Sequence, residues 1–244
     1  MTTHRKLLVA LPVHNEEVDL LKNVPIIHKF LQRSLRNFEW EIAIVEQAST
    51  DKTKLVAERF AREFEHVRFE SRPHKGRGGA LREIWKKFDG DYLSYMDIDL
   101  SAKLEFFPKL ITALENGYEI AVGSRHNAKS VTKNRLLFRK FASRSYNIFL
   151  KSIFGARFED AQCGFKAIRK ETFQKLEPHL KNTGWLFDTE LLILAEKTDR
   201  KIAVVPIEWR DDPITTVIMW KYAIEGLWES LRLFIMRPWK TIKK

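Results

Sequence analysis

The chain has 244 residues, of which 44% are hydrophobic, and a formal net charge of +11. This length and apolar fraction suit one large α/β domain and argue against intrinsic disorder. The positive charge favours anionic partners, such as nucleic acid, anionic lipid or phosphorylated substrates, and by itself does not choose among them.

Short apolar runs alternate along the chain with segments of helical periodicity. The strands we expect are Lys6–Leu11, Glu41–Glu46, Val67–Ser71, Tyr92–Asp97, Ile120–Ser124 and Ala203–Pro206. The helices we expect are Glu17–Leu35, Asp51–Phe64, Gly79–Phe88, Leu104–Asn116, Asn134–Phe154, Lys170–His179, Asp188–Thr198 and a C-terminal helix from about Thr216. Alternating strands and helices predict a mostly parallel, doubly wound sheet flanked by helices, with ligands bound beyond the carboxyl ends of the strands.

No repeat or linker divides the chain, so we expect a catalytic domain over residues 1–213, followed by a basic amphipathic helix and tail over 214–244. The apolar run Leu7–Val13 contains Pro12 and is typical of a buried strand, not of a signal peptide. No stretch approaches the roughly 18 apolar residues of a membrane span. The single cysteine, Cys163, excludes an intramolecular disulfide and fits the cytoplasm.

Two aspartates, Asp97 and Asp99, stand at the end of the apolar-rich strand that begins at Tyr92. With Ile98 between them, the chain can turn both carboxylates toward one ligand. Mg²⁺ and Mn²⁺ prefer oxygen ligands, and typically take one or two carboxylates together with substrate phosphates and water. A cation held there would neutralise charge on a departing diphosphate. The alternative is a solvated turn with an aspartate helix cap.

Polar side chains also follow the first two expected strands. After the first, Asn15 or Glu16 can cap the next helix or contact a nucleotide. After the second, Ser49 suits an ordinary helix cap, whereas Glu46 and Gln47 offer an acceptor and an amide suited to a base edge or to ribose hydroxyls.

Two further segments could meet phosphate. Lys75–Arg82 contains three glycines, which would let the backbone approach a ligand, and Arg77, which could bind an anion. Its spacing fits neither a Walker loop nor a Rossmann fingerprint, and a basic surface loop is the alternative. Arg125 follows the strand Ile120–Ser124 and could hold a diphosphate bidentately or lie in an exposed turn.

The segments Asp160–Lys166 and Gly184–Glu190 interleave polar and aromatic residues, as a pocket wall with a few placed carboxylates does. Asp188 is equally a natural helix N-cap. Cys163 has no obvious base beside it, and we expect a small buried residue there, not a nucleophile.

Taken together, the order and spacing of these segments resemble the family 2 glycosyltransferases of the dolichyl-phosphate mannose synthase type, including their bacterial polyprenyl-phosphate relatives. The matching segments are Leu11–Glu17, Ala48–Asp51, Gly76–Arg82, Asp97–Ser101, Gly123–Arg125, Asp160–Lys166, Trp185–Glu190 and Val205–Trp209. The resemblance implies a GT-A fold, a UDP- or GDP-sugar donor, a divalent metal ion (Mg²⁺ or Mn²⁺) and inversion at the anomeric carbon.

The resemblance also implies roles for single residues. The expectations combine these roles with those that follow from the individual segments. The expected nucleotide-sugar contacts are Pro12, Asn15, Glu16, Glu46, Gln47, Ser49, Arg77 and Asp97. The expected metal-side residues are Asp97, Asp99 and Ser101, and the expected catalytic set is Asp99, Arg125, Asp160, Lys166 and Asp188. Glu46 or Gln47 stands where the family usually has an aspartate, and Ser101 where it often has a glutamine. Many relatives also carry C-terminal transmembrane helices, which this sequence lacks.

The acceptor side is expected in the segment from His126 to Phe158, which carries eight basic residues and no acidic ones. Interleaved apolar residues predict a basic amphipathic helix, suited to an anionic membrane surface or an anionic acceptor. Arg135, Arg139 or Arg144 could hold the acceptor phosphate. The C-terminal segment is similar, and the alternative for both is a helix packed on the core.

We therefore expect an inverting, metal-dependent hexosyltransferase that acts on a polyprenyl or dolichyl phosphate, as a peripheral protein on the cytoplasmic face of the membrane, in cell-envelope synthesis. An anionic acceptor oxygen would need little base catalysis, so placement and charge neutralisation would dominate. A hydroxyl acceptor on a glycolipid or cell-envelope glycan is an alternative, with Asp160 or Asp188 as base. A nucleotidyltransferase is more remote, because Pro12–Glu17 replaces the glycine-rich, lysine-bearing loop of those enzymes. We expect a membrane-protein partner, and no nucleic-acid partner, since no recognised motif for one is present.

Overall fold

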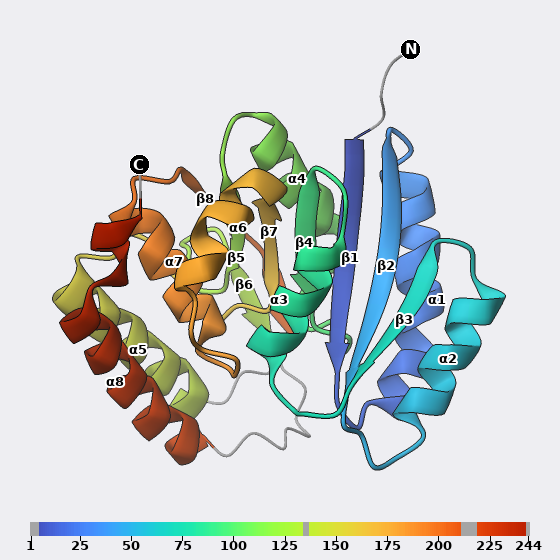
Figure 1. Ribbon diagram of the computed structural model, residues 1–244, viewed down its shortest axis with the longest axis horizontal. Coiled ribbons are helices and arrows are strands. Elements are labelled where there is room, and N and C mark those ends of the chain that lie inside the picture. The colour runs from blue at the N-terminus through green and yellow to red at the C-terminus, as the bar shows by residue number, and fades with distance from the viewer. Residues whose placement is uncertain (1–4, 134–136, 211–218, 243–244) are drawn as a thin grey trace.

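The computed structural model describes residues 5–133, 137–210 and 219–242. Its centre is a seven-stranded sheet with the strand order β3-β2-β1-β4-β7-β5-β8 (Figure 1). These strands are β1 (Arg5–Val13), β2 (Phe38–Gln47), β3 (Val67–Arg72), β4 (Tyr92–Met96), β5 (Ile120–Ser124), β7 (Phe165–Arg169) and β8 (Ile202–Pro206). Strand β7 runs antiparallel to β4 and β5, whereas the other pairs are parallel.

Helices cover both faces of this sheet (Figure 1). One face carries α1 (Glu17–Ser34), α2 (Thr53–Glu63) and α4 (Phe107–Glu115). The other carries α3 (Arg77–Lys87), α5 (Leu137–Phe154), α6 (Lys170–Leu176) and α7 (Phe187–Lys197), with α8 (Met219–Met236) packed outside α5. Short 3₁₀ turns are η1 (Leu104–Phe106), η2 (Glu177–His179) and η3 (Pro238–Thr241). None of the described helices combines the length and apolarity needed to cross a bilayer.

The core explains why β1 reads as an unbroken apolar run. Leu7, Val9 and Leu11 face the helices α1, α2 and α4, whereas Leu8 and Ala10 face α3 and α7, and all five are fully buried. A central parallel strand is covered on both faces, so its side chains are apolar at every position and not at alternate ones. Each buried leucine contributes about 1.5–3 kcal/mol relative to an exposed one.

The expected doubly wound α/β sheet is confirmed, with ends shifted by a few residues. Strand β7 was not expected, because a five-residue strand between a polar loop and a helix gives little periodic signal, and strand direction depends on tertiary pairing. The small parallel pair β6 (Val131–Lys133) and β9 (Glu208–Arg210) was also missed. The expected helix starts at Asn134 and Thr216, and the expected domain boundary at 213, lie outside the described residues.

Candidate active site

The loops that follow β1 and β2 brace each other at the carboxyl edge of the sheet. The backbone N–H of Asn15 donates to Ser49 Oγ at 3.1 Å, and Asn15 Oδ1 accepts from the N–H of Thr50 at 2.8 Å. The N–H of Glu16 donates to the Oγ1 of buried Thr53 at 2.7 Å. These reciprocal bonds fix the two loops relative to each other, so both present a defined surface to a ligand.

Glu46 and Gln47 are buried, and their side chains are engaged within the protein. Glu46 Oε1 accepts from the N–H of Ser49 at 2.5 Å, and its Oε2 accepts from Ser71 Oγ at 2.7 Å. Gln47 Oε1 accepts from the N–H of Gly76 at 3.0 Å, which joins β2 to the start of α3. Both residues therefore shape the loops around the site, and their expected contact with a base or ribose stays a prediction.

Carboxylates crowd together where β1 and β4 end. Burial raises the pKa of Glu16 to about 8, assisted by the charge and hydrogen bond of Asp19 and by the charges of Asp99 and Asp97. Partial removal from water and the charge of Asp97 raise the pKa of Asp99 to about 6. Burial and neighbouring negative charges both disfavour the ionised form of a carboxyl group. Glu16 and Asp99 are therefore harder to ionise than exposed carboxyl groups.

This donor set fits a divalent cation held with substrate. Among the described residues, no three His, Cys, Asp or Glu side chains are arranged to chelate a metal ion by themselves. Mg²⁺ and Mn²⁺ sites of the phosphate-transfer type need only one or two carboxylates, because phosphates and water complete the coordination. Asp97 and Asp99 would supply those carboxylates, and a cation there would offset the burial and the Asp97 charge that raise the pKa of Asp99.

The turn between the aspartates is held by specific hydrogen bonds. Ser101 donates to Asp99 twice, from its N–H to Oδ1 at 2.9 Å and from its Oγ to Oδ2 at 2.8 Å. Buried Asn23 donates its Nδ2 to the carbonyl of Ile98 at 2.8 Å. Leu100 takes a left-handed conformation with φ 53°, which reverses the chain. Ser101 thus orients the Asp99 carboxylate, and its expected contact with a metal stays a prediction.

Arg77, the first residue of α3, links the aspartate site to α7. Its Nη2 lies 3.0 Å from Asp97 Oδ1, and its Nη1 lies 3.9 Å from Asp188 Oδ2. The guanidinium carbon lies 3.9 Å from the ring centroid of Trp185, which is a cation–π contact. Only 12% of the Arg77 side chain is exposed. Arg77 is thus a fixed cation beside Asp97.

A buried ion pair lies behind Arg77. Lys166 Nζ lies 3.1 Å from Asp188 Oδ1 and donates to the carbonyl of Cys163 at 2.5 Å. The hydroxyl of Tyr95 donates to the same Asp188 oxygen at 2.5 Å, and burial, followed by the Asp188 charge, raises the pKa of Tyr95, which keeps this donor protonated. Burial also raises the pKa of the Cys163 thiol to about 12, in keeping with a small buried residue.

The glycines before and within α3 pack against the loop that precedes α7. The N–H of Gly78 donates to the carbonyl of Gly184 at 3.2 Å, and the N–H of Gly79 donates to that of Thr183 at 2.9 Å. A Cβ atom on Gly78 would overlap the Cβ of Phe187 and lie 2.9 Å from its Cγ. These N–H groups therefore bind protein carbonyls, and glycine permits the close approach of α3 and α7.

Arg125 and Asp160 form a second buried pair. Arg125 Nε lies 2.7 Å from Asp160 Oδ2, its Nη2 lies 2.8 Å from Oδ1, and its backbone N–H donates to Oδ2 at 3.0 Å. Burial alone would raise the pKa of Asp160, but the charge and hydrogen bonds of Arg125 lower it to about 2. The Arg125 guanidinium also lies over the Trp209 ring, 4.9 Å from its centroid. Both Asp160 oxygens are engaged, so a role as base would require this pair to open.

The three arginines expected at the acceptor are only partly described. Arg135 and the side chain of Arg139 lie outside the described residues, whereas Arg144 is exposed on α5. His126 Nε2 lies 2.8 Å from Ser143 Oγ, which joins the loop after β5 to the first half of α5. The structure therefore brings α5 to the edge of the site, and the phosphate-binding role of the arginines stays a prediction.

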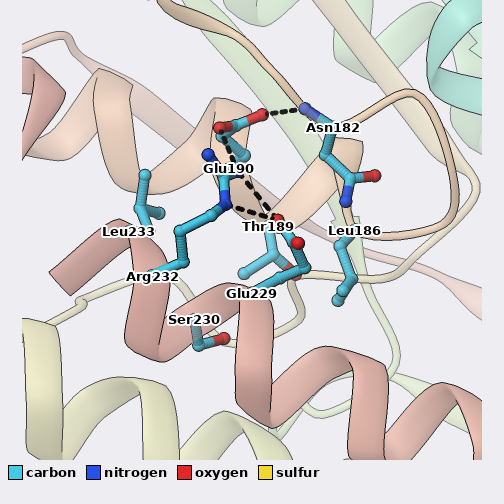
Figure 2. A pocket seen from close by; sticks show the side chains of 8 residues that line it. All are labelled: Asn182, Leu186, Thr189, Glu190, Glu229, Ser230, Arg232 and Leu233. Carbon is cyan, nitrogen blue, oxygen red and sulfur yellow. Dashed lines mark hydrogen bonds and ion pairs between the residues drawn. The ribbon is translucent and has the colours of Figure 1, made fainter. Parts of the chain in front are cut away.

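A small pocket between α7 and α8 is closed by polar contacts (Figure 2). Glu190 of α7 accepts from the N–H groups of Lys181 at 2.8 Å and Asn182 at 2.7 Å. Arg232 of α8 lies 3.3 Å from Glu190 Oε1 and 2.8 Å from Glu229 Oε2. Helix α8 therefore stabilises the loop before α7, against which the glycine segment packs.

Sequence reasoning did not identify Asp19, Tyr95 or Trp185 as parts of the site. Asp19 lies in the first turn of α1, where acidic residues are common because they complement the helix dipole. Tyr95 lies inside an apolar strand, and Trp185 lies in a segment that the sequence predicts only as part of a pocket wall. Neither residue therefore had a sequence pattern that assigned it to the site. Pro12, an expected contact, is half-buried near the end of β1.

A sequence model described as Glycosyl transferase family 2 matches residues 8–177. The chain belongs to this family. It is 32% identical over 226 residues to the dolichyl-phosphate beta-glucosyltransferase of Saccharomyces cerevisiae, covering 84% of this chain and 67% of the relative. It is 31% identical over 211 residues to glycosyltransferase AglD of Haloferax volcanii, covering 86% of this chain but only 34% of the relative. This glycosyltransferase chain therefore spans about a third of AglD.

Solved structures show the same fold. Glucosyl-3-phosphoglycerate synthase from Mycobacterium tuberculosis, in complex with UDP, superposes with a TM-score of 0.67 at 21% identity, covering 92% of this chain and 79% of that one. Its complex with Mn²⁺ and UDP-glucose also gives a TM-score of 0.67, at 18% identity. The GT-A fold implied by the family resemblance is thereby confirmed.

Replacement of Gly78 by alanine should destabilise the protein by about 1–3 kcal/mol, because the added methyl group forces α3 away from Phe187. Urea unfolding measures this change. Gly184→Ala is the matched control, since a Cβ there would meet its nearest neighbour, Asn182 Oδ1, at 3.5 Å, an ordinary contact distance. Equal stabilities of the two variants would contradict the described packing.

Without divalent cations, the free energy of unfolding should fall as pH rises from about 5 to about 8. Folded Glu16 keeps its proton up to about pH 8, whereas the unfolded chain releases it near 4.5, so the folded state binds more protons in this window. Glu16→Gln cannot ionise and should match the parent at pH 5 and exceed it in stability at pH 8, by urea unfolding. The same gain in Glu58→Gln would assign the effect to net charge instead.

Proposed function

We propose that this glycosyltransferase moves a hexose from a UDP- or GDP-sugar to a polyprenyl or dolichyl phosphate, with a divalent cation at Asp97 and Asp99. The observation that carries the proposal is the position of Asp97 and Asp99 directly after the buried strand β4, beside the braced loops that follow β1 and β2. Bound Mg²⁺ or Mn²⁺ would supply charge neutralisation for the departing diphosphate. The mycobacterial synthase of similar fold has been crystallised with Mn²⁺ and UDP-glucose, which supports this choice of donor and metal.

The braced loops after β1 and β2 would form the nucleotide side of the site. Asn15, Ser49 and Glu16 lie on them, and the mutual hydrogen bonds of these loops hold them ready before the donor arrives. Such preorganisation reduces the conformational entropy lost on binding. Glu46 and Gln47 would contribute by fixing the shape of the loop, because their side-chain oxygens already accept hydrogen bonds from the protein.

Two buried ion pairs would place positive charge around the reacting groups. Asp160 would hold Arg125 in one orientation, so that its charge acts on the donor diphosphate or on the acceptor phosphate. The pair of Lys166 and Asp188 would position Arg77, which in turn fixes Asp97. In this scheme the two buried aspartates act through the arginines that they bind.

A phosphate acceptor fits this arrangement better than a hydroxyl acceptor. A hydroxyl needs a general base, whereas an acceptor phosphate oxygen is already anionic near neutral pH. The two carboxylates considered as bases, Asp160 and Asp188, are both buried in ion pairs. The yeast relative is named a dolichyl-phosphate beta-glucosyltransferase, which supports a lipid phosphate as acceptor and glucose as the first sugar to test.

Helices α5 and α8 would bring the protein to the membrane that holds such an acceptor. Along α5, Leu137, Phe141 and Ile148 are exposed together with the basic Lys140 and Arg144. Along α8, the exposed apolar residues are Leu227, Trp228, Leu231, Phe234, Ile235 and Met236. Exposed apolar residues beside cations suit the surface of an anionic membrane. The cytoplasmic face stays a prediction, and the comparisons give no support to the expected membrane-protein partner.

We expect measurable transfer of glucose from UDP-glucose to dolichyl phosphate in the presence of Mn²⁺. Asp99→Asn should lower kcat by about 10²–10³-fold, which is the usual effect of losing one group that stabilises charge in the transition state. Radiolabelled sugar in the lipid phase provides the assay, with GDP-mannose as the second donor. Asp89→Asn, which removes an exposed carboxylate elsewhere, is the control. Near-normal turnover of Asp99→Asn would refute the site, and equal transfer to dolichol would favour a hydroxyl acceptor.

Arg125→Ala should cost about 3–5 kcal/mol of unfolding free energy, because it leaves the Asp160 carboxylate buried without its cation. Arg125→Lys keeps the charge but cannot engage both carboxylate oxygens, so it should retain more stability than Arg125→Ala while still losing transfer activity. Urea unfolding and initial rates measure the two effects separately. Full stability of Arg125→Ala would argue against the pairing.

A further inference from the structure

A second, basic cavity lies away from the carboxyl edge of the sheet. It has a volume of about 260 Å³ and opens at the C-terminal end of α8, beside η3 and the end of α5. Figure 1 shows the carboxyl ends of β1 and β2 at the bottom of the view and the end of α8 near the C-terminus at the upper left. The cavity is thus separate from the candidate active site.

The floor of this cavity is aromatic. Phe154, which is 3% exposed, packs edge-on against Phe234 with ring centroids 6.0 Å apart and against Trp239 with centroids 6.1 Å apart. Arg237 joins α8 to η3 in a left-handed conformation with φ 45°, ahead of Pro238. A residue other than glycine rarely adopts this backbone geometry. The resulting reversal lets Trp239 reach Phe154.

The rim of the cavity is cationic. Lys197, Arg237 and Lys240 line it, and no acidic side chain does. Lys197 Nζ lies 5.9 Å from the Trp239 ring centroid, and the Arg237 guanidinium carbon lies 5.1 Å from that of Phe234. Within residues 5–133, 137–210 and 219–242, none of the three cations is in an ion pair with a carboxylate. Three cations without acidic partners around an apolar floor select an anion that also carries an apolar part.

We propose that this cavity binds the headgroup of an anionic phospholipid. Trp228, Leu231 and Ile235 are exposed on α8 and lead toward the cavity at helical spacing, which gives acyl chains an apolar path. Trp239 beside Lys240 is the residue pairing that favours a membrane interface. The inference rests on the membrane association proposed above and adds to it one specific site and one class of lipid.

Binding of a short-chain, monomeric phosphatidylglycerol to the full chain tests this site without donor, metal or acceptor. Isothermal titration should show saturable binding, and little with the matching phosphatidylcholine. The double variant Lys197→Gln with Lys240→Gln should weaken binding about 25-fold. Each basic residue near an anionic lipid contributes about 1 kcal/mol, which is about a fivefold change in affinity. Arg237→Gly tolerates the left-handed backbone while removing the guanidinium, and should weaken binding about fivefold.

The matched control is Lys22→Gln with Lys54→Gln, which removes the same charge from exposed positions on α1 and α2. An equal loss in this control would assign binding to net charge and overturn the site. Equal binding of phosphatidylcholine, or equal binding of glycerol 3-phosphate, would overturn the choice of lipid. Sedimentation with phosphatidylcholine vesicles tests the apolar face of α8 separately, so loss of the site and loss of membrane association are distinguishable.

Discussion

Negative charge concentrated at the end of β4 is the constraint around which the candidate site is organised. Asp97 and Asp99 follow a strand buried on both faces, and Glu16 adds a carboxylate from the neighbouring loop. Toward α3 this charge is balanced by Arg77. Burial, with the charges of the neighbouring carboxylates, raises the pKa values of Glu16 and Asp99. Perturbed pKa values of this kind are concentrated at the functional sites of proteins.

The surrounding structure keeps these charges in place by buried contacts between segments that are distant in sequence. Lys166 and Asp188 are buried and paired, so neither can move without leaving the other charge unpaired in the interior. Gly78 allows α3 to approach α7 closely enough for Arg77 to reach both Asp97 and Asp188. The rigidity of the site therefore arises from the buried Lys166–Asp188 pair and from the close packing of α3 on α7 that Gly78 permits.

The sequence predicted the parts of this structure that depend on local patterns. Apolar runs located the central strands, and polar residues after them located the loops that meet at the carboxyl edge. The sequence could not predict which side chains interact. Nothing in its pattern showed that Asp160 pairs with Arg125, or that the Gln47 side chain accepts a hydrogen bond from Gly76. The glycine segment suggested backbone open to a ligand, but its N–H groups bind protein carbonyls. Such pairings are set by tertiary contacts between segments distant in sequence.

Strand β7 runs against its neighbours, and this direction has a topological effect. The chain leaves β5 and enters β7 at the same edge of the sheet, so no crossover helix is required between them. The excursion contains β6, which pairs with β9, and α5, which is held by side-chain packing through residues such as Leu150 and Phe154. Its length can therefore change between β6 and β7 without shifting the register of the seven-stranded sheet. A fold built in this way can exchange the insert between β5 and β7 for another while the half of the sheet formed by β1 to β4 stays constant.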